Sequence, residues 1–406
     1  MKKLIAIVLA VLMFALPTLA MADELTMGSW RTDDVEQVSA LLAQYEELTG
    51  VKIVFQPTQS TQYNATLRSQ LDGGIGPDLF YSRTCEAGAE LYENGFNVVC
   101  NDIPGVMENF TDVARSGFTA DDGNVFAVPF AAVSHFVYYN KAIFAENNIE
   151  IPATFEDFLA VCQQLKDAGI QPLSNGIADN WDILECVLCG MIPNYITAEE
   201  RVAYEKGERK LNDETFVRVL SDFAKLVPFF PESFASMGND MANVTFGLGQ
   251  SAMLIDGSWS YGTLAGDEYD IDVGFFPIPA PAGNAAGYSL HPDCGFAGNA
   301  ASAHPEEVKA FLAWVASVDG AKIAASVVPE GFMPLINADV VPEGSAVKEM
   351  IELGEGKNSD MRFVWSKMLN LYTPMVEQLN AICRGEQTPE GAADALNALW
   401  EAELAK

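Results

Sequence analysis

The stretch that decides the fold lies near the amino terminus, where residues 25–55 read LTMGSWRTDDVEQVSALLAQYEELTGVKIVF. Residues 25–28 are strand-like, apolar side chains recur at helical spacing over residues 35–48, and a β-branched run follows at 51–55. Strand, helix and strand in this order predict a βαβ unit, because a helix-length connection favours parallel strands joined by a right-handed crossover. The chain is therefore expected to have an α/β fold.

The alternation continues downstream of this unit. A further helix is expected over residues 63–71 and a third strand over 77–81. Residues 133–139 are strand-like, and Thr154, followed three residues later by Asp157, predicts a helix that opens with a capping box. The carboxyl-terminal third is mainly helical by its periodicity. At roughly 150 residues per domain, a chain of 406 residues is long enough for two domains.

The first 22 residues are typical of a secretory signal peptide. Lys2 and Lys3 precede an almost uninterrupted apolar segment, Leu4 to Leu16, and the small-residue sequence Ala20-Met21-Ala22 follows as a cleavage site. No later stretch has the roughly 18 consecutive apolar residues of a transmembrane helix, so we expect no direct membrane insertion. No cysteine stands at the end of the leader, as a lipid anchor would require. These features predict a periplasmic protein that is free of the membrane.

The charge balance excludes several classes of partner. The chain has 23 Lys and Arg against 56 Asp and Glu, a formal net charge of -33. Nucleic acids and anionic lipid surfaces bind through basic patches, so neither is an expected partner. Hydrophobic residues make up 49% of the chain and charged residues 19%, which is typical of a folded globular protein and not of a disordered one.

No motif for catalysis or for metal binding stands out in the sequence. The three histidines are widely separated, and no GxSxG, P-loop or HExxH motif occurs. Cys186 and Cys189 have redox spacing but lie in an apolar run, so a buried thiol pair or a structural bridge is expected there. Two carboxylates could serve glycoside hydrolysis, but among 56 acids no particular pair is indicated. We therefore predict no catalytic residue, no cofactor and no metal.

Tryptophan and polar residues gather in four short clusters at strand ends or in loops, at residues 29–34, 81–83, 179–181 and 256–259. Open α/β sheets bind their ligands at the carboxyl ends of the strands. An indole ring offers a flat apolar face to the C–H face of a pyranose, and neighbouring Asp, Arg and Asn side chains satisfy sugar hydroxyls. The clusters therefore predict a carbohydrate-binding site.

An ordered series of short motifs covers nearly the whole chain after the leader, at residues 45–51, 76–80, 123–129, 138–141, 152–155, 180–181, 252–259, 273–279 and 385–388. In this series the sequence resembles the carbohydrate-binding extracellular solute-binding proteins of ABC importers, the group related to maltose-binding protein. The resemblance implies the type II periplasmic-binding-protein fold, with two α/β lobes, a hinge and a ligand cleft between them. It implies a first lobe of residues 23–133 and 288–337, and a second lobe of residues 134–287 and 338–406.

The resemblance also implies which residues face the cleft. Tryptophan and arginine side chains are expected to contact the sugar and aspartates to accept its hydroxyls. Asp256 could equally cap the following helix, and His291 is a weaker candidate. The expected ligand-binding residues are Trp30, Arg31, Asp33, Arg83, Asp179, Trp181, Asp256, Trp259, Asp293, Arg362 and Trp365.

The function that follows is that of the substrate-binding component of an ABC sugar importer. We expect a monomer that captures a mono- or oligosaccharide, closes around its hinge and delivers the sugar to the membrane permease. One alternative is a protein of the same fold that binds a cation such as a polyamine through acids and tryptophans, although Arg31 and Arg83 argue against it. The other alternative is a secreted glycosidase.

Overall fold

The computed structural model describes residues 24–32, 34–328 and 330–406. The predicted signal peptide and the candidate Asp33 lie outside the described residues.

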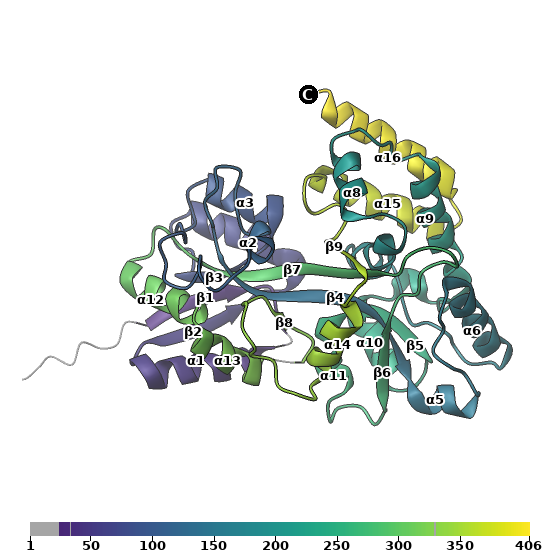
Figure 1. Ribbon diagram of the computed structural model, residues 1–406, viewed down its shortest axis with the longest axis horizontal. Helices are drawn as coiled ribbons and strands as arrows, with labels where there is room; N and C mark the ends of the chain where they lie inside the picture. Colours follow the sequence, from purple (N-terminus) through teal and green to yellow (C-terminus); the bar gives the residue numbers. More distant parts are fainter. Residues whose placement is uncertain (1–23, 33, 329) are drawn as a thin grey trace, which may run out of the picture.

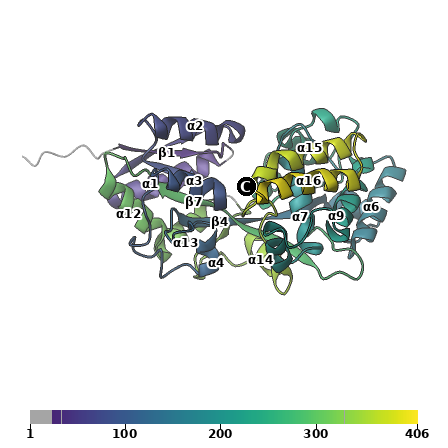
Figure 2. The ribbon, with the colours of Figure 1, turned by 90° about the horizontal axis from the view of Figure 1, so that it is seen from above.

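Two lobes lie side by side, and two long strands run from one to the other (Figure 1). These crossing strands are β4 (Val128–Asn140) and β7 (Gly287–Gly298), which pair antiparallel with each other. The view from above shows the same division, with β4 and β7 between the lobes (Figure 2). The lobes are thus connected through a shared pair of strands.

Each lobe has its own hydrophobic core. The core of the first lobe takes its buried side chains from residues 25–133 and 294–340. That of the second lobe takes them from residues 137–278 and 363–400. A smaller cluster beside the crossing strands includes Phe136, Tyr288 and Met350. The lobe boundaries drawn from the sequence stay a prediction.

The sheet of the first lobe begins with the predicted βαβ unit, which is confirmed. Strand β1 (Glu24–Ser29) pairs parallel with both β2 (Lys52–Pro57) and β3 (Leu79–Ser82), and helix α1 (Val35–Thr49) forms the first connection. Helix α1 ends at Gly50, whose φ of 77° is a left-handed conformation that suits glycine. The strand order across the crossing is β2-β1-β3-β7-β4-β5, and β3 meets β7 antiparallel.

Helices cover the sheet of the first lobe (Figures 1 and 2). They are α2 (Ser60–Asp72), α3 (Cys85–Glu93), α4 (Asp112–Ser116), α12 (Pro305–Val315) and α13 (Val318–Val327). No single helix among the described residues is long and apolar enough to cross a membrane, and the pair α12 and α13, bent by 76°, passes that test only jointly and only by length and composition.

The second lobe combines short strands with most of the helices. Its strands are β5 (Met253–Gly257) and β6 (Val273–Pro277), which pair with β4, and β9 (Asn358–Asp360), which pairs with β7. Strand β8 (Met333–Pro334) pairs with β4 at Ala131 and Ala132, beside the first lobe. Its helices are α5 (Lys141–Glu146), α6 (Phe155–Asp167), α7 (Cys189–Met191), α8 (Ala198–Glu205), α9 (Glu214–Ala224), α10 (Asn239–Gly247), α11 (Tyr261–Leu264), α14 (Ala346–Gly354), α15 (Tyr372–Cys383) and α16 (Pro389–Leu404).

Helix α6 opens as the sequence predicts. The Thr154 side chain accepts a hydrogen bond from the Asp157 backbone N–H, and the Asp157 carboxylate accepts one from the Thr154 N–H in return. This reciprocal capping box satisfies two N–H groups that no intrahelical carbonyl can reach.

All seven cysteines are free thiols, including Cys186 and Cys189, so no structural bridge forms there.

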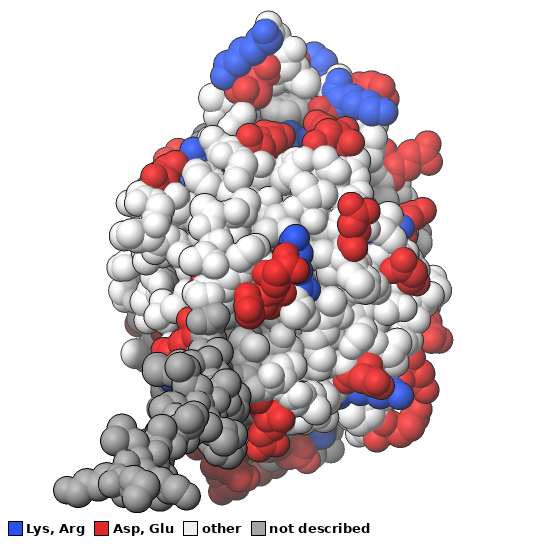
Figure 3. Space-filling view, turned by 90° about the vertical axis from the view of Figure 1, so that its left-hand side faces the viewer, with Lys and Arg blue, Asp and Glu red and all other residues white. Residues whose placement is uncertain are grey.

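On the face in Figure 3, acidic side chains are scattered among uncharged residues, and basic ones occur singly or in small groups. That face therefore presents no extended basic patch.

Candidate ligand-binding site

A small hollow lies where the two lobes meet. The first lobe contributes Thr84, Cys85 and Gly117, the second contributes Met361, Arg362 and Trp365, and strand β7 contributes His291 and Pro292. Because both lobes and a crossing strand line it, a molecule bound here would hold the lobes together.

Arg83 and Trp30 pack against each other in the first lobe, next to Thr84 and Cys85 of the hollow. Strand β3 ends at Ser82, which places Arg83 at its carboxyl end. The Arg83 guanidinium lies 3.8 Å from the centre of the Trp30 ring, and Tyr63 and Tyr81 meet the same indole edge-on. Trp30 is only 6% exposed. It supports Arg83, and its ring is not free to stack on a sugar as the sequence predicted.

Close backbone packing fixes Arg83 in this place. A Cβ atom on Gly88 of helix α3 would lie 2.1 Å from the Arg83 carbonyl oxygen, so only glycine lets the helix approach the strand end. Between them, Cys85 has a φ of 54°, which is uncommon for a residue with a side chain. Such backbone strain is frequent at binding sites.

Arg31 is held by interactions within the protein. Its Nε lies 2.8 Å from a carboxylate oxygen of Asp34, both side chains are buried, and its guanidinium stacks on Phe332 at 4.2 Å. A buried, paired guanidinium has little capacity left for a ligand. Arg31 therefore orders the loop around Phe332 in this structure.

Three tryptophans converge around Arg362 on the side of the second lobe. Trp181 and Trp259 are 6.1 Å apart between ring centres. The Arg362 guanidinium lies 5.7 Å from the Trp259 ring and 5.5 Å from the Trp365 ring. Trp259 also packs against the core of the first lobe. The structure thus brings together four of the predicted residues from distant parts of the sequence.

Two carboxylates hold Arg362. Its Nη1 lies 2.7 Å from Glu185 and 3.7 Å from Asp293, and the Tyr372 hydroxyl donates to the other oxygen of Glu185. Burial alone would raise the pKa of Asp293, but His291, Arg362 and Arg83 together hold it below its usual value. Asp293 is therefore an ionised carboxylate.

Two histidines from the crossing strands meet beside this network. The rings of His135 on β4 and His291 on β7 stack 5.5 Å apart at 13°, and His135 Nδ1 lies 2.9 Å from the Ser289 hydroxyl. Burial lowers the pKa of both histidines, aided by the charge of Arg362, and brings that of His291 to about 4. Both rings are neutral at physiological pH, and three of their nitrogens have no hydrogen-bond partner, although His291 Nε2 lies 3.8 Å from Asp293.

Asp256 lies behind the tryptophans. Its carboxylate accepts hydrogen bonds from the Asn243 amide, the Ser260 hydroxyl, the Gly257 backbone N–H and the Cys186 thiol. A carboxylate has about four lone-pair positions, so none remains for a sugar hydroxyl. Asp256 thus orders the chain that carries Trp259, although neither of the helices that follow it, Ser258–Ser260 and Tyr261–Leu264, has a side-chain cap.

The carboxylates of Asp182 and Asp256 and the Cys186 thiol have ligand atoms within 4.8 Å of one another, which is spacing that could hold a metal ion. The four protein donors on Asp256 already compensate its charge. Burial, with Asp256 next to it, raises the pKa of Asp182 well above its usual value, so that a proton neutralises this second carboxyl. Hydrogen bonds and a proton therefore compensate the two buried carboxyls beside Cys186.

Asp179 has a structural position as well. Its carboxylate accepts a hydrogen bond of 2.7 Å from the backbone N–H of Asn239, the first residue of α10. A carboxylate at a helix amino terminus stabilises the helix through its unpaired N–H groups and its dipole. The structure therefore places Asp179 at the start of α10 and outside the hollow.

Sequence reasoning missed three residues of the network: His135, Glu185 and Tyr372. Glu185 lies in a π-helical turn over Ile183–Leu188, where every side chain is buried. Such turns are rare and occur frequently at functional sites. The one available signal was a single charge inside an otherwise apolar run, whereas nothing near Tyr372 or His135 distinguishes them from core residues.

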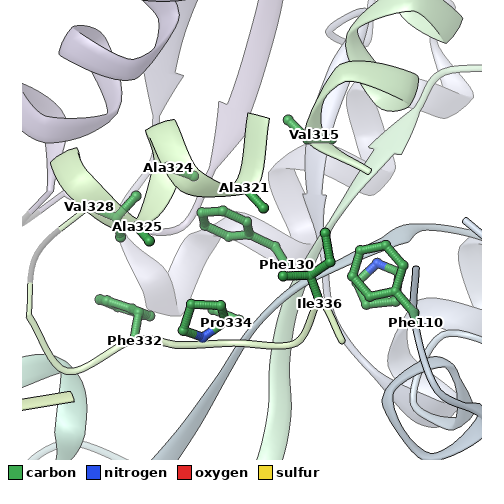
Figure 4. Close-up of a pocket in the computed structure, with 12 residues that line it drawn as sticks. Phe110, Phe130, Val315, Ala321, Ala324, Ala325, Val328, Phe332, Pro334 and Ile336 are labelled. Carbon is green, nitrogen blue, oxygen red and sulfur yellow. The ribbon is translucent and has the colours of Figure 1, made fainter. Parts of the chain in front are cut away.

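A second hollow lies in the first lobe under α13 (Figure 4). Phe130, Phe332 and Pro334 point into it, and its other walls are also apolar. Sugar hydroxyls would lose their hydrogen bonds with water there and gain none from these side chains. This hollow does not suit a carbohydrate.

Comparison with known proteins gives concordant results. The sequence profile described as bacterial extracellular solute-binding protein matches residues 28–322. An uncharacterised ABC transporter extracellular-binding protein of Pyrococcus horikoshii is 25% identical over 348 residues, which are 81% of this chain and 76% of that protein.

Solved structures match over nearly the whole chain. The solute receptor AcbH, described as preferring β-D-galactopyranose, is 18% identical with a TM-score of 0.83, over 94% of this chain and 99% of that one. A chitin oligosaccharide binding protein is 20% identical with a TM-score of 0.80, over 95% of this chain and 100% of that one. At these identities the likeness shows the fold, and it confirms the two-lobed type II architecture.

Proposed function

Since this chain belongs to the bacterial extracellular solute-binding proteins, the substrate-binding components of ABC transporters, we propose that it binds a carbohydrate between its lobes for import. The observation that carries the proposal is the hollow itself, which is lined from both lobes and has Trp365 and Arg362 on one wall. Of the predicted residues, Arg362 and Trp365 line the hollow. Arg83, Trp181, Trp259 and Asp293 lie behind this lining and are the further residues that we propose for contact with the sugar.

The chemistry of the hollow suits a sugar. A pyranose has apolar C–H faces and hydroxyls that both donate and accept, so its sites combine aromatic rings with charged and polar groups. Here Trp365 lies beside Arg362 and His291, and the indole N–H of Trp365 has no partner. Two proteins of the same fold bind galactopyranose and chitin oligosaccharides by their descriptions, which supports the same class of ligand here.

A cationic ligand fits less well. The guanidiniums of Arg83 and Arg362 both face this region, and burial lowers the pKa of Arg83 because the charged form loses hydration. Glu185 and Asp293 are already paired with Arg362. A polyamine would add positive charge next to two buried cations without a free carboxylate to receive it.

A glycosidase also fits less well. Hydrolysis of a glycoside needs one carboxyl that is protonated near neutral pH to act as the general acid. Of the acids nearest Arg362, Glu185 is ion-paired and the pKa of Asp293 is lowered. Asp182, which keeps its proton, is buried beside Asp256 and does not line the hollow. We therefore propose that the protein binds its sugar without breaking a bond. Closure around the crossing strands would then present the bound sugar to the permease.

Thermal unfolding with a panel of mono- and oligosaccharides, polyamines and metal ions tests this proposal. A sugar present at 100 times its Kd should stabilise the protein by about 2.7 kcal/mol. Trp365→Phe should reduce this stabilisation, because a smaller ring without an N–H replaces the indole. The matched change Trp314→Phe, on α12 in the first lobe, should leave it unchanged. Stabilisation by a polyamine or a metal ion with no response to any sugar would contradict the proposal.

A further inference from the structure

Unpaired nitrogen atoms dominate the buried polar atoms around the hollow. Among the described residues at the hollow and directly behind its lining, the buried nitrogens without a hydrogen-bond partner are Arg83 Nε, His135 Nε2, His291 Nδ1, His291 Nε2, Arg362 Nε and Trp365 Nε1, while Asp182 Oδ2 and Asn243 Oδ1 have none farther back, near Asp256. A buried polar atom without a partner costs about 1–3 kcal/mol, so these atoms are expected to meet a ligand.

Most of these nitrogens can act only as donors. Guanidinium and indole N–H groups donate and never accept, which gives three obligate donors from Arg83, Arg362 and Trp365. A neutral imidazole has one donor and one acceptor, so His291 adds one of each, while the role of His135 Nε2 depends on the proton shared with Ser289. The ligand therefore needs more acceptors than donors on the side that faces these residues.

The acids of the site do not supply these acceptors. One oxygen of Glu185 is ion-paired with Arg362, and the other accepts a hydrogen bond from the Tyr372 hydroxyl. Asp293 lies closest to His291 and Arg362, at 3.8 and 3.7 Å. By contrast, no carboxylate of a described residue comes within 4.0 Å of Arg83, whose polar contact is a 3.5 Å hydrogen bond to Ser60.

The two arginines approach the site from different lobes. Arg83 follows β3 in the first lobe and Arg362 follows β9 in the second. Burial lowers the pKa of Arg83, and the nearby charge of Arg362 lowers it further, whereas Asp293 and Glu185 raise it. The four formal charges cancel, so net charge does not select the ligand. The ligand is instead selected by Arg83, which of these four residues is the one without an ion pair to a described residue.

We propose that the sugar carries a carboxylate, as a uronic acid does, and that Arg83 binds this group opposite Arg362. A carboxylate offers about four acceptor positions and no donor, and a guanidinium can bind it through two parallel hydrogen bonds. The acid group would give Arg83 the ion pair that Arg362 already has with Glu185 and Asp293. Because it would lie between groups of both lobes, its recognition favours the closed state. This inference rests on the proposed sugar-binding function.

Calorimetric titration with matched sugars tests the inference: galacturonate against galactose, and glucuronate against glucose. The acid of at least one pair should bind at least tenfold more tightly than its neutral partner. Arg83→Gln should bring the two affinities to within about threefold of each other. Arg68→Gln, a change on the outer face of α2 where Arg68 pairs with Asp72 and Glu90, should preserve the preference. Thermal unfolding without ligand verifies that each variant is folded.

The outcomes separate the two proposals. If a neutral sugar binds as tightly as its acid or more tightly, the carboxylate inference is wrong and the sugar-binding function stands. If neither acid nor neutral sugars bind, the proposed function itself fails. If succinate binds as tightly as the uronates, the site recognises a carboxylate without a sugar ring. A preference for the acid that survives Arg83→Gln would overturn the role of Arg83.

Discussion

Asp182 shows how a single buried acid is accommodated beside the site. Its side chain is 1% exposed, one of its oxygens has no partner, and Asp256 lies next to it. Burial and this second carboxyl raise its pKa, so the folded protein keeps a proton that the unfolded chain releases near pH 4. The resulting loss of stability is absent in acid and grows as the pH rises.

Asp182→Asn should therefore stabilise the protein in a pH-dependent way. The amide keeps the shape of the protonated acid without the cost of holding the proton. Relative to the unchanged protein, we expect a gain of about 1–2 kcal/mol in the free energy of unfolding at pH 8, and a smaller gain at pH 5. Denaturant unfolding at the two pH values measures it. Asp240→Asn, at an exposed acid on α10, should show no such trend, and a variant less stable than the parent at pH 8 would refute the interpretation.

The individual site residues were only partly predictable. Trp181, Trp259, Arg362 and Trp365 do converge, because each follows or precedes an element whose place the pattern indicates. Trp30 has the right position and a different role, since the Arg83 side chain covers its face. Contacts between distant segments decide which face of a ring is covered, and a local sequence pattern does not reveal these contacts.

At the scale of secondary structure, the crossing strands β4 and β7 carry the stacked pair His135 and His291. Burial holds the pKa of His291 at about 4, whereas an unfolded chain binds a proton near pH 6.5. A histidine whose pKa is lowered on folding stabilises the folded state above the unfolded pKa. That contribution is lost as the pH falls toward 4.

His291→Gln should therefore flatten the pH dependence of stability. The charged and titratable groups that face this ring are His135, Asp293 and Arg362. Between pH 6.5 and 4.5, the variant should lose less unfolding free energy than the parent, by about 1–2 kcal/mol. Chemical unfolding at several pH values provides the comparison. A loss of stability in the variant as steep as that of the parent over this pH range would contradict the assignment.

Local signals predicted the regular elements well and the irregular one poorly. Helix α1 and the capping box of α6 depend on residues close together in the sequence, which a local pattern reveals. The π-helical turn around Glu185 depends on Arg362 and Tyr372, which lie far along the chain. Its apolar sequence alone favours an ordinary core helix.

At the scale of the whole molecule, contacts outside the hollow also join the lobes. Lys367 pairs with Asp121 at 3.0 Å, and the Leu369 backbone N–H donates to the Glu86 carboxylate at 3.0 Å. Glu86 and Asp121 belong to the first lobe, and residues 367 and 369 precede α15 in the second. These contacts stabilise the closed arrangement independently of any ligand.

Removal of these contacts should open the protein without its ligand. Glu86→Ala combined with Asp121→Ala should increase the radius of gyration measured by small-angle X-ray scattering, and bound sugar should reverse the increase. Exposed ion pairs contribute only about 0–1 kcal/mol, so the shift in population is moderate. Glu90→Ala with Asp122→Ala removes neighbouring acids whose partners, Arg68 and Tyr92, lie within the first lobe. An equal expansion in that control would contradict the assignment.

The two-lobed architecture could be predicted from the sequence because the motifs of the family occur in order along the chain. Family membership and fold are confirmed. The carboxylate that we propose on the sugar could not be predicted from the sequence, since the proposal depends on which nitrogens remain unpaired once both lobes and both crossing strands meet. Such an inventory requires the three-dimensional structure.

A crystal structure of the protein with a sugar identified by the thermal panel tests the central claim most directly. The account predicts a sugar ring between the lobes, beside His291, Arg362 and Trp365, with Arg83 in hydrogen-bond contact. Electron density for the ligand in the apolar hollow under α13, or on the outer surface of one lobe, would contradict it.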